Sequence, residues 1–423
     1  MKKPLLSFIL LLLGFSLFSQ NLDKDFASIE DKVIQWRRHF HENPELSNRE
    51  FNTAKTIAKH LKNLGIETKE NVAKTGVVGI LKGNQPGKVV ALRADIDALP
   101  VVERNNLPFK STVKSNYLGK DVGVMHACGH DTHTAILMGV AEILSKNKDL
   151  IKGTVKFIFQ PAEEGAPEGE EGGAELMVKE GVLKNPDVDA IFGLHISSGF
   201  DVGTISYKSG GIMAASQSFK IKVKGKQSHG SRPWTGIDPI MISAKIIDAL
   251  QTIISREVNL TNEGAVITVG KIDSGVRSNI IPESAEMIGT IRTLDYGMQK
   301  QINDRMKEMV PAIAKSYRAE ATIEIEKGYP ITFNNIELTK QVLPTLHNVA
   351  GKENVKLIKA ITGAEDFSFF QKEVPGFYFF LGGKTIGNEN PYPHHTPDFI
   401  IDESGMLLGV KTMTQLALDF LNN

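Results

Sequence analysis

A strand that ends in paired carboxylates decides the fold: residues 154–164 read TVKFIFQPAEE. The run from Thr154 to Gln160 is rich in β-branched and aromatic residues, which predicts a buried strand. Pro161 stops it, and Glu163 and Glu164 follow. In open α/β sheets, ligands bind beyond the carboxyl ends of the strands, so carboxylates at this point indicate a site. We therefore expect an α/β sheet with its chemistry along one edge.

Strands and helices alternate on both sides of this stretch. An apolar pattern of helical spacing fills residues 23–64, is interrupted at Asn43-Pro44 and is stopped by Gly65. The other predicted elements are helices at 134–144 and 173–180 and strands at 77–81, 89–92 and 190–195. This alternation predicts a mostly parallel sheet that helices cover on both faces.

The pattern changes near residue 210. Residues 218–224, SFKIKVK, alternate strictly between apolar and charged, as in a half-exposed antiparallel strand. Helix and strand patterns continue to residue 326, and the α/β pattern returns after Gly328-Tyr329-Pro330. We therefore expect a catalytic α/β domain in two pieces, 21–210 and 329–423, with a smaller α+β domain inserted at 211–328.

The charge balance and the N-terminal sequence limit the classes to which the protein can belong. The 49 basic and 49 acidic residues balance, which excludes a nucleic-acid-binding or anionic-membrane surface. Lys2 and Lys3 precede an apolar run from Leu5 to Phe18, the pattern of a signal peptide, which we place at residues 1–20. We expect an exported protein, periplasmic or secreted, that is not membrane-bound after signal removal. The single cysteine excludes an intrachain disulfide framework.

The densest group of titratable side chains lies at residues 125–134, MHACGHDTHT. A thiolate and an imidazole two residues apart on a loop can point at one metal ion. His195 ends a predicted strand, and His394 and His395 share a proline-rich loop. Together, two adjacent divalent ions fit the donor set Cys128, His130, Glu164, His195 and one of His394 or His395. Glu163 is then left as a general base for an attacking water.

These motifs resemble the peptidase M20 metallohydrolases, in the branch of aminoacylase-like amidohydrolases that includes hippurate and indole-acetyl-amino-acid hydrolases. The resemblance runs in order along essentially the whole chain beyond the signal peptide. Its motifs are WRRHFHENPELS at 36–47, RADIDALP at 93–100, MHACGHDTHT at 125–134, QPAEEG at 160–165, GLH at 193–195, SNIIP at 278–282, GTIRT at 289–293, GAEDF at 363–367 and HTP at 395–397.

The resemblance implies a dinuclear-metal catalytic domain with an inserted lid and dimerisation domain. The implied metal ligands are Cys128, His130, Glu164, His195 and, because it stands directly before Thr-Pro, His395. Glu163 matches the catalytic glutamate. Cys128 stands where relatives outside this branch have a bridging aspartate, so a bridging thiolate is implied. Two divalent ions per subunit are implied as the cofactor, and zinc, manganese, cobalt and nickel all suit these donors.

The inserted domain supplies further implied roles. His229 matches a histidine that reaches the active site of the partner subunit in a homodimer and steadies the oxyanion. Asn279 and Arg292 match positions that bind the substrate carboxylate or brace the tetrahedral intermediate.

Two features of the catalytic domain remain. Asp97 is interpreted as a group that orients a ligand imidazole, or as a plain strand-end cap. The loop 165–173 departs from a short glycine run, and we interpret its three carboxylates as solvated charge.

The function that follows is metal-dependent hydrolysis of N-acyl amino acids or related short amides. An M20-type carboxypeptidase or dipeptidase that acts on short peptides is the alternative. Other classes fit less well. A cysteine hydrolase with Cys128 as nucleophile would not need Glu163, Glu164 or His195, and a zinc deaminase requires a second cysteine pair. A non-enzymatic metal-binding protein would have no use for the spare carboxylate of Glu163.

Overall fold

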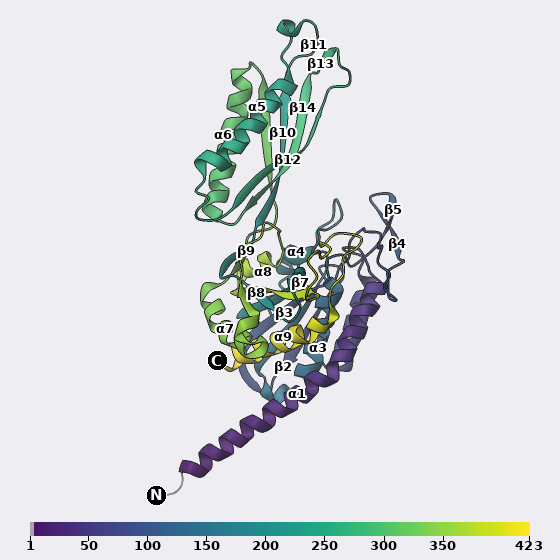
Figure 1. The fold of residues 1–423 in the computed structure, drawn as a ribbon, viewed down its shortest axis with the longest axis vertical. Helices are drawn as coiled ribbons and strands as arrows, with labels where there is room; N and C mark the ends of the chain where they lie inside the picture. Colours follow the sequence, from purple (N-terminus) through teal and green to yellow (C-terminus); the bar gives the residue numbers. More distant parts are fainter. Residues whose placement is uncertain (1–3) are drawn as a thin grey trace. The chain divides into compact units, whose positions relative to one another are not determined.

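The computed structural model describes residues 4–423, with side chains from Leu22 onward (Figure 1). The signal peptide was predicted at residues 1–20. Residues 1–3 lie outside the described residues, and no side chain is described before Leu22, so the signal peptide stays a prediction. Within the described part of the chain, no helix combines the length and apolar character needed to cross a bilayer. Two compact units are present. Unit 1 comprises the residues up to Ser209, Asn334–Ile358 and Phe369–Asn423, and unit 2 comprises Gly210–Phe333 and Lys359–Ser368.

An eight-stranded sheet forms the centre of unit 1 within residues 4–423. Its order is β1 (Glu67–Val72), β2 (Gly76–Lys82), β6 (Lys152–Gln160), β3 (Gln85–Asp95), β7 (Ala190–Asp201), β18 (Gly376–Lys384), β8 (Ile205–Tyr207) and β17 (Val355–Leu357). The four central strands, from β6 to β18, are mutually parallel. β1, β2 and β6 pair in antiparallel fashion, as do β18 and β8. The predicted mixed α/β architecture with a mostly parallel sheet is confirmed.

The helices of unit 1 pack through apolar residues that recur along one side of each helix. In α1 (Pro4–Glu42), Ile29, Val33 and Phe40 are buried at helical spacing. α3 (His130–Lys146) is buried along nearly its whole length and packs with α1 and α9. The other helices and hairpin strands are α2 (Phe51–Asn63), α4 (Gly173–Lys179), α7 (Ile336–Ala350), α8 (Ser368–Glu373), α9 (Met406–Asn422), β4 (Lys114–Tyr117) and β5 (Lys120–Gly123).

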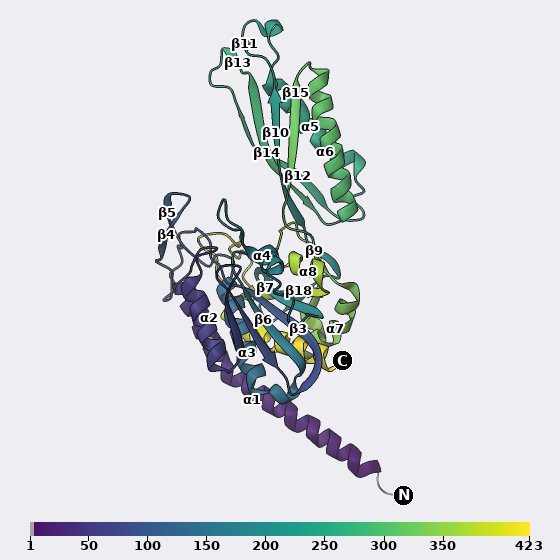
Figure 2. The same ribbon diagram turned by 180° about the vertical axis from the view of Figure 1, so that it is seen from behind.

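Unit 2 is a small α+β unit. Its antiparallel sheet has the order β12 (Ala265–Ser274), β14 (Ser284–Thr293), β10 (Ala215–Lys224) and β15 (Glu320–Lys327). α5 (Pro239–Thr252) and α6 (Tyr296–Ser316) lie side by side on one face of it (Figures 1 and 2). Phe219, Ile221 and Val223 of β10 are buried toward these helices, as their alternation predicts.

The limits of unit 2 differ from the predicted 211–328. β16 (Thr332–Asn334) pairs with β9 (Gly210–Met213), which extends the unit to Phe333. Residues 359–368 also belong to it, because Ile361 bridges to Met213 and Ala214 donates its N–H to the carbonyl of Gly363. A short further pair joins β11 (Ser228–His229) to β13 (Ile280–Ile281).

Candidate metal centre

Three neighbouring strands deliver the candidate residues to one edge of the unit 1 sheet. β3 ends at Asp95, which pairs with Gln160 at the end of β6, and Glu163 and Glu164 follow directly. His195 lies in β7, two residues beyond the last pair with β3. The predicted strand end at His195 is wrong, because β7 continues to Asp201 alongside β18. Pairing on the β3 side has stopped by then, so the histidine still stands at the open edge.

A glycine turn sets Cys128 and His130. Gly129 has a φ of 94°, and a Cβ there would lie 2.3 Å from Cγ2 of Ile196, so the position requires glycine. α3 begins at His130 and not at the predicted residue 134, so the histidine stands in the first helical turn rather than on a loop. The tight turn at Gly129 therefore lets the side chains of Cys128 and His130 approach one another.

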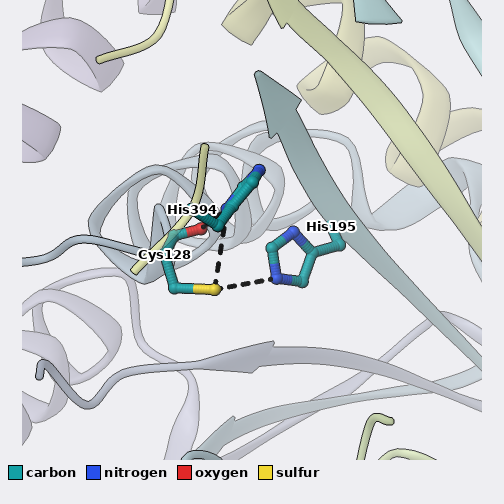
Figure 3. Close-up of side chains that lie close together, drawn as sticks. All are labelled: Cys128, His195 and His394. Carbon is teal, nitrogen blue, oxygen red and sulfur yellow. Dashed lines mark hydrogen bonds between the residues drawn. The ribbon is translucent and has the colours of Figure 1, made fainter. Parts of the chain in front are cut away.

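The Cys128 sulfur is the centre of the donor group (Figure 3). Its Sγ lies 3.4 Å from Nε2 of His195, 3.3 Å from Nε2 of His395 and 3.7 Å from Nδ1 of His394. Donor atoms of Cys128, His130 and Glu164 also lie within 4.8 Å of one another. Ligands at zinc bond lengths around a tetrahedral ion are separated by about 3.5 Å. The side chains are thus spaced as ligands of shared ions.

Hydrogen bonds fix the tautomers that metal binding needs. Nδ1 of His130 donates to the carbonyl and carboxylate oxygens of Asp97 at 3.0 and 3.2 Å, and Nε2 has no hydrogen-bond partner among the described residues. Nδ1 of His195 donates to the carbonyl of Ile196 at 2.5 Å. In each ring the other nitrogen therefore carries a lone pair for an ion. The orphaned, buried Nε2 of His130 shows that a divalent metal fits this donor set.

His394 and His395 are separated by their hydrogen bonds. Nδ1 of His394 lies 3.1 Å from the carbonyl of Cys128, and its Nε2 accepts from the N–H of Ser198 at 3.2 Å. Both of its ring nitrogens are therefore engaged by backbone. Nε2 of His395 instead lies 3.1 Å from Oε1 of Glu164. His394 thus links the Cys128 loop to β7 and also lies within 4.8 Å of Cys128 and His195, whereas His395 lies beside Glu164.

The charge of the site favours cations. Although burial lowers the pKa of His130, the carboxylates of Asp95, Asp97 and Glu164 raise it to about 10. Burial and the charges of Glu164 and Glu163 raise the pKa of the Cys128 thiol well above its usual range. A bound divalent cation reverses both shifts, because it favours the thiolate of Cys128 and the neutral ring of His130, whose Nε2 then carries a lone pair. The site is built to hold positive charge.

Two aspartates, Asp97 and Asp95, orient groups of the site through hydrogen bonds. Oδ2 of Asp97 accepts from the Ser47 hydroxyl at 2.7 Å and from the Glu164 N–H at 3.1 Å, so Asp97 orients His130 and the Glu164 backbone together. Asp95 accepts from Nδ1 of His133 at 2.6 Å. The other nitrogen of His133 accepts from the N–H of Ile196 at 2.7 Å. We predicted no role for His133 from the sequence, although its place three residues after His130 puts both rings on one helix face.

The extended loop after Glu164 is held by charge. Glu170, which we interpreted as solvated charge, stays partly exposed, and its carboxylate accepts hydrogen bonds from Arg49 at 2.5 Å, Lys74 at 2.6 Å and Asn48 at 3.0 Å. These donors come from distant segments, so the local pattern does not predict them. Glu170 belongs to none of the metal-binding groups found among the described residues.

The other predicted residues lie in unit 2, apart in sequence from the ligands in unit 1. His229 is exposed, and its Nδ1 accepts from the N–H of Ser231 at 3.1 Å. Asn279 adjoins it, because its carbonyl accepts from Gly230 at 2.8 Å. Arg292 stands at the far end of β14, where it is half-buried. Unit 2 thus brings His229 and Asn279 together and keeps Arg292 separate.

Comparison with known proteins gives the family. The model of peptidase family M20/M25/M40 matches residues 91–419. The chain belongs to the M20 family. A thermostable carboxypeptidase of Saccharolobus solfataricus is 46% identical over 95% of this chain and 99% of its own length. An N-acetyl-L-cysteine deacetylase of Bacillus subtilis is 37% identical over 90% of this chain and 86% of its own length.

Solved structures agree with this membership. A dinuclear metal-binding M20 peptidase of Bacillus subtilis has a TM-score of 0.78 at 35% identity, covering 94% of this chain and 99% of its own. The M20 fold and the donor groups in unit 1 together make this protein a metal-dependent hydrolase of amide bonds. The resemblance drawn from the sequence motifs is confirmed.

Proposed function

We propose that this M20 enzyme hydrolyses the amide bond of N-acyl amino acids or related short amides. The observation that carries the proposal is the convergence of Cys128, His130, Glu164, His195 and His395 beside the nearly buried carboxylate of Glu163. Its relatives include proteins named as an N-acetyl-L-cysteine deacetylase and an IAA-amino acid hydrolase of Arabidopsis thaliana.

A carboxypeptidase or dipeptidase acting on short peptides is the second candidate. It is favoured by the thermostable carboxypeptidase of Saccharolobus solfataricus, whose 46% identity exceeds that of the deacetylase. Both candidates use the same chemistry on an amide next to a free carboxylate. They differ only in what occupies the acyl side.

The reaction is divided among the residues of unit 1. The five ligands would hold two divalent ions, which would supply the Lewis acidity that polarises an amide carbonyl and lowers the pKa of a water. Glu163 takes the proton of the attacking water and returns it to the leaving amine. Asp97 holds the Nδ1 proton of His130, which leaves the Nε2 lone pair of that ring to bind a metal. Zinc, manganese, cobalt and nickel are the proposed metals.

We place the remaining roles in a homodimer. His229, exposed and pinned through Nδ1, would steady the oxyanion of the partner subunit, and Asn279 and Arg292 would bind the substrate carboxylate. The end strands β12 and β15 leave the unit 2 sheet with edges suited to pairing. The protein is proposed to be exported to the periplasm or secreted, which fractionation of cells that produce the full chain would test.

The deciding experiment is a panel of N-acyl amino acids and dipeptides assayed with the metal-loaded enzyme. Hydrolysis that a chelator abolishes and iodoacetamide leaves intact supports the proposal. Activity that persists in metal-free protein would mean that Cys128 acts as a nucleophile instead.

Two isosteric variants then separate the neighbouring glutamates. Glu163→Gln should lower kcat by about 100-fold or more while metal content stays full, because a base acts only on the transition state. Glu164→Gln should reduce metal occupancy. The reverse pattern in elemental analysis would exchange the two roles.

A further inference from the structure

A buried glutamate stands at the start of α2 without capping it. Glu50 occupies the N-cap position, is 0% exposed and makes no side-chain hydrogen bond to its own helix. Capping comes from Glu45, whose carboxylate accepts from the N–H groups of Asn52 and Thr53 at 2.9 and 2.8 Å. Because burying a carboxyl group is unfavourable unless it has partners, Glu50 must be held inward by contacts elsewhere.

Those contacts reach the catalytic segment. Oε1 of Glu50 accepts from the N–H of Ala162 at 2.9 Å, and Oε2 accepts from the Thr75 hydroxyl at 2.5 Å. Thr75 and Ala162 are themselves 1% and 2% exposed, so water does not compete for these bonds. The contact joins residues 112 positions apart in the chain.

Ala162 has an unusual backbone. Its φ of 52° lies in the left-handed region, which is unfavourable for a residue with a Cβ. Loss of the Glu50 carboxyl group would leave the buried N–H of Ala162 without this hydrogen-bond acceptor, which is also unfavourable. The Glu50 bond can therefore hold a conformation that alanine does not favour.

The residues after Ala162 carry the chemistry. Glu163 follows it directly, and the N–H of Glu164 is held by Asp97 at 3.1 Å. Two buried carboxyl groups from separate segments thus fix the first and third N–H groups of Ala162-Glu163-Glu164. A rotation at Ala162 would redirect both glutamate side chains.

We propose that Glu50 is a positioning residue for the reaction, which holds Ala162 in its left-handed conformation and thereby aims Glu163 and Glu164. The inference rests on the proposed function, because it takes Glu163 as the base and Glu164 as a metal ligand.

Glutamine is the conservative replacement at this position. Burial, with a further contribution from the charge of Asp97, raises the pKa of Glu50 to about 8, so the side chain is largely neutral near pH 7. In Glu50→Gln the amide oxygen accepts from Ala162, and the NH2 group donates to the Thr75 hydroxyl, which can also accept. Glu50→Ala removes both bonds. Glu45→Ala is the matched control, because it weakens the same helix start without touching Ala162.

Kinetics give the first readout. Glu50→Ala should lower kcat by about 10- to 100-fold with KM changed less than about threefold, since small misplacements of reacting groups have effects of this size. Glu50→Gln should stay within about threefold of wild type, and Glu45→Ala should lower the melting temperature but keep kcat. Adding Ala162→Gly should shrink the loss caused by Glu50→Ala, because glycine adopts the left-handed region freely.

Hydrogen exchange gives a readout that needs no substrate. A peptide spanning residues 160–166 should exchange faster in Glu50→Ala than in wild type, Glu50→Gln or Glu45→Ala. Wild-type exchange in Glu50→Ala would overturn the proposal, as would a kcat in Glu50→Gln as low as in Glu50→Ala. An inactive wild type with the expected exchange pattern would refute the proposed function and leave the role of Glu50 in holding Ala162 standing.

Discussion

Asp131 is the shared anion of a buried charge cluster under the start of α3, and Asp131→Asn tests what that cluster contributes. Oδ2 of Asp131 lies 2.8 Å from Nε of Arg37 and 2.8 Å from Nδ1 of His41. Nε2 of His41 lies 3.1 Å from Oε1 of Glu103. Arg37 and His41 are 1% and 0% exposed, so neither can turn to water. Asparagine keeps the volume and removes the charge.

The expected loss of stability in Asp131→Asn depends on the partners that Arg37 and His41 keep. Removing one partner of a buried ion pair costs about 3–5 kcal/mol. Arg37 keeps Glu403 at 3.2 Å, and His41 keeps Glu103, so the lower end applies. We expect a loss of about 3 kcal/mol in the free energy of unfolding. Asp398→Asn, which removes the partner of the 64% exposed Arg104, should change the free energy of unfolding little, because solvent screens the pair.

The assay must report unit 1 alone. The chain has two tryptophans, Trp36 beside the cluster in α1 and the exposed Trp234 in unit 2. Urea unfolding followed by fluorescence in a Trp234→Phe background isolates Trp36, whose ring lies 4.8 Å from that of His60. Equal losses for Asp131→Asn and Asp398→Asn would refute the reasoning.

A pH series checks the electrostatic origin. Burial raises the pKa of Asp131, but the charges of Arg37 and His41 outweigh it and hold the pKa below its ordinary range. A carboxylate with a lowered folded pKa stabilises the protein above the unfolded value of about 3.9, and this stability fades below it. The gap between wild type and Asp131→Asn should therefore be full at pH 6 and about 1 kcal/mol smaller at pH 3. A gap independent of pH would contradict the charge argument.

Three further predictions follow from the same structure. Lys156 is 1% exposed and donates to the carbonyls of Val182, Lys184 and Pro186 at 2.9, 2.9 and 3.0 Å. Lys156→Met should therefore lower the free energy of unfolding, measured in urea, by about 3 kcal/mol. The control Lys152→Met, at an exposed position, should change it little. Metal removal by a chelator should abolish hydrolysis but leave the circular dichroism spectrum nearly unchanged, because the apolar core of unit 1 holds the sheet without the ligands; a collapse of the spectrum would show that metal is needed to fold. His229→Ala should lower kcat without metal loss, and mixing it with Glu163→Ala should restore activity if His229 acts in the partner subunit; no recovery after verified subunit exchange would exclude that action.

Local patterns predicted the elements of the fold well because their causes are local. The spacing of Ile29, Val33 and Phe40 follows the helix period, and the alternation in β10 follows the strand period. The segments that carry the candidate ligands could be named for the same reason, since each has its own residue signature, although His195 lies inside β7 and His130 in the first turn of α3. The limits of unit 2 were less predictable, because the pairing of residues 359–368 depends on distant segments.

The support of the site could not be derived from local pattern. Glu50 stands before a helix like any capping residue, and only the folded chain places it against Ala162. Glu170 looks like loop charge until Arg49 and Lys74 are brought beside it. His394 and His395 are adjacent and chemically identical, and only the folded chain shows that backbone groups of Cys128 and Ser198 engage the ring of His394. These contacts are fixed by tertiary structure, which a one-dimensional pattern does not contain.

The position of β18 has a consequence for biosynthesis. This strand comes from residues 376–384, yet it lies between β7 and β8 inside the sheet, and His395 follows it. A growing chain therefore lacks an interior strand and one proposed metal ligand until synthesis is nearly complete. Stable metal uptake must await the docking of this late segment. The ion that the enzyme acquires is then set by the metals available wherever that last step of folding occurs.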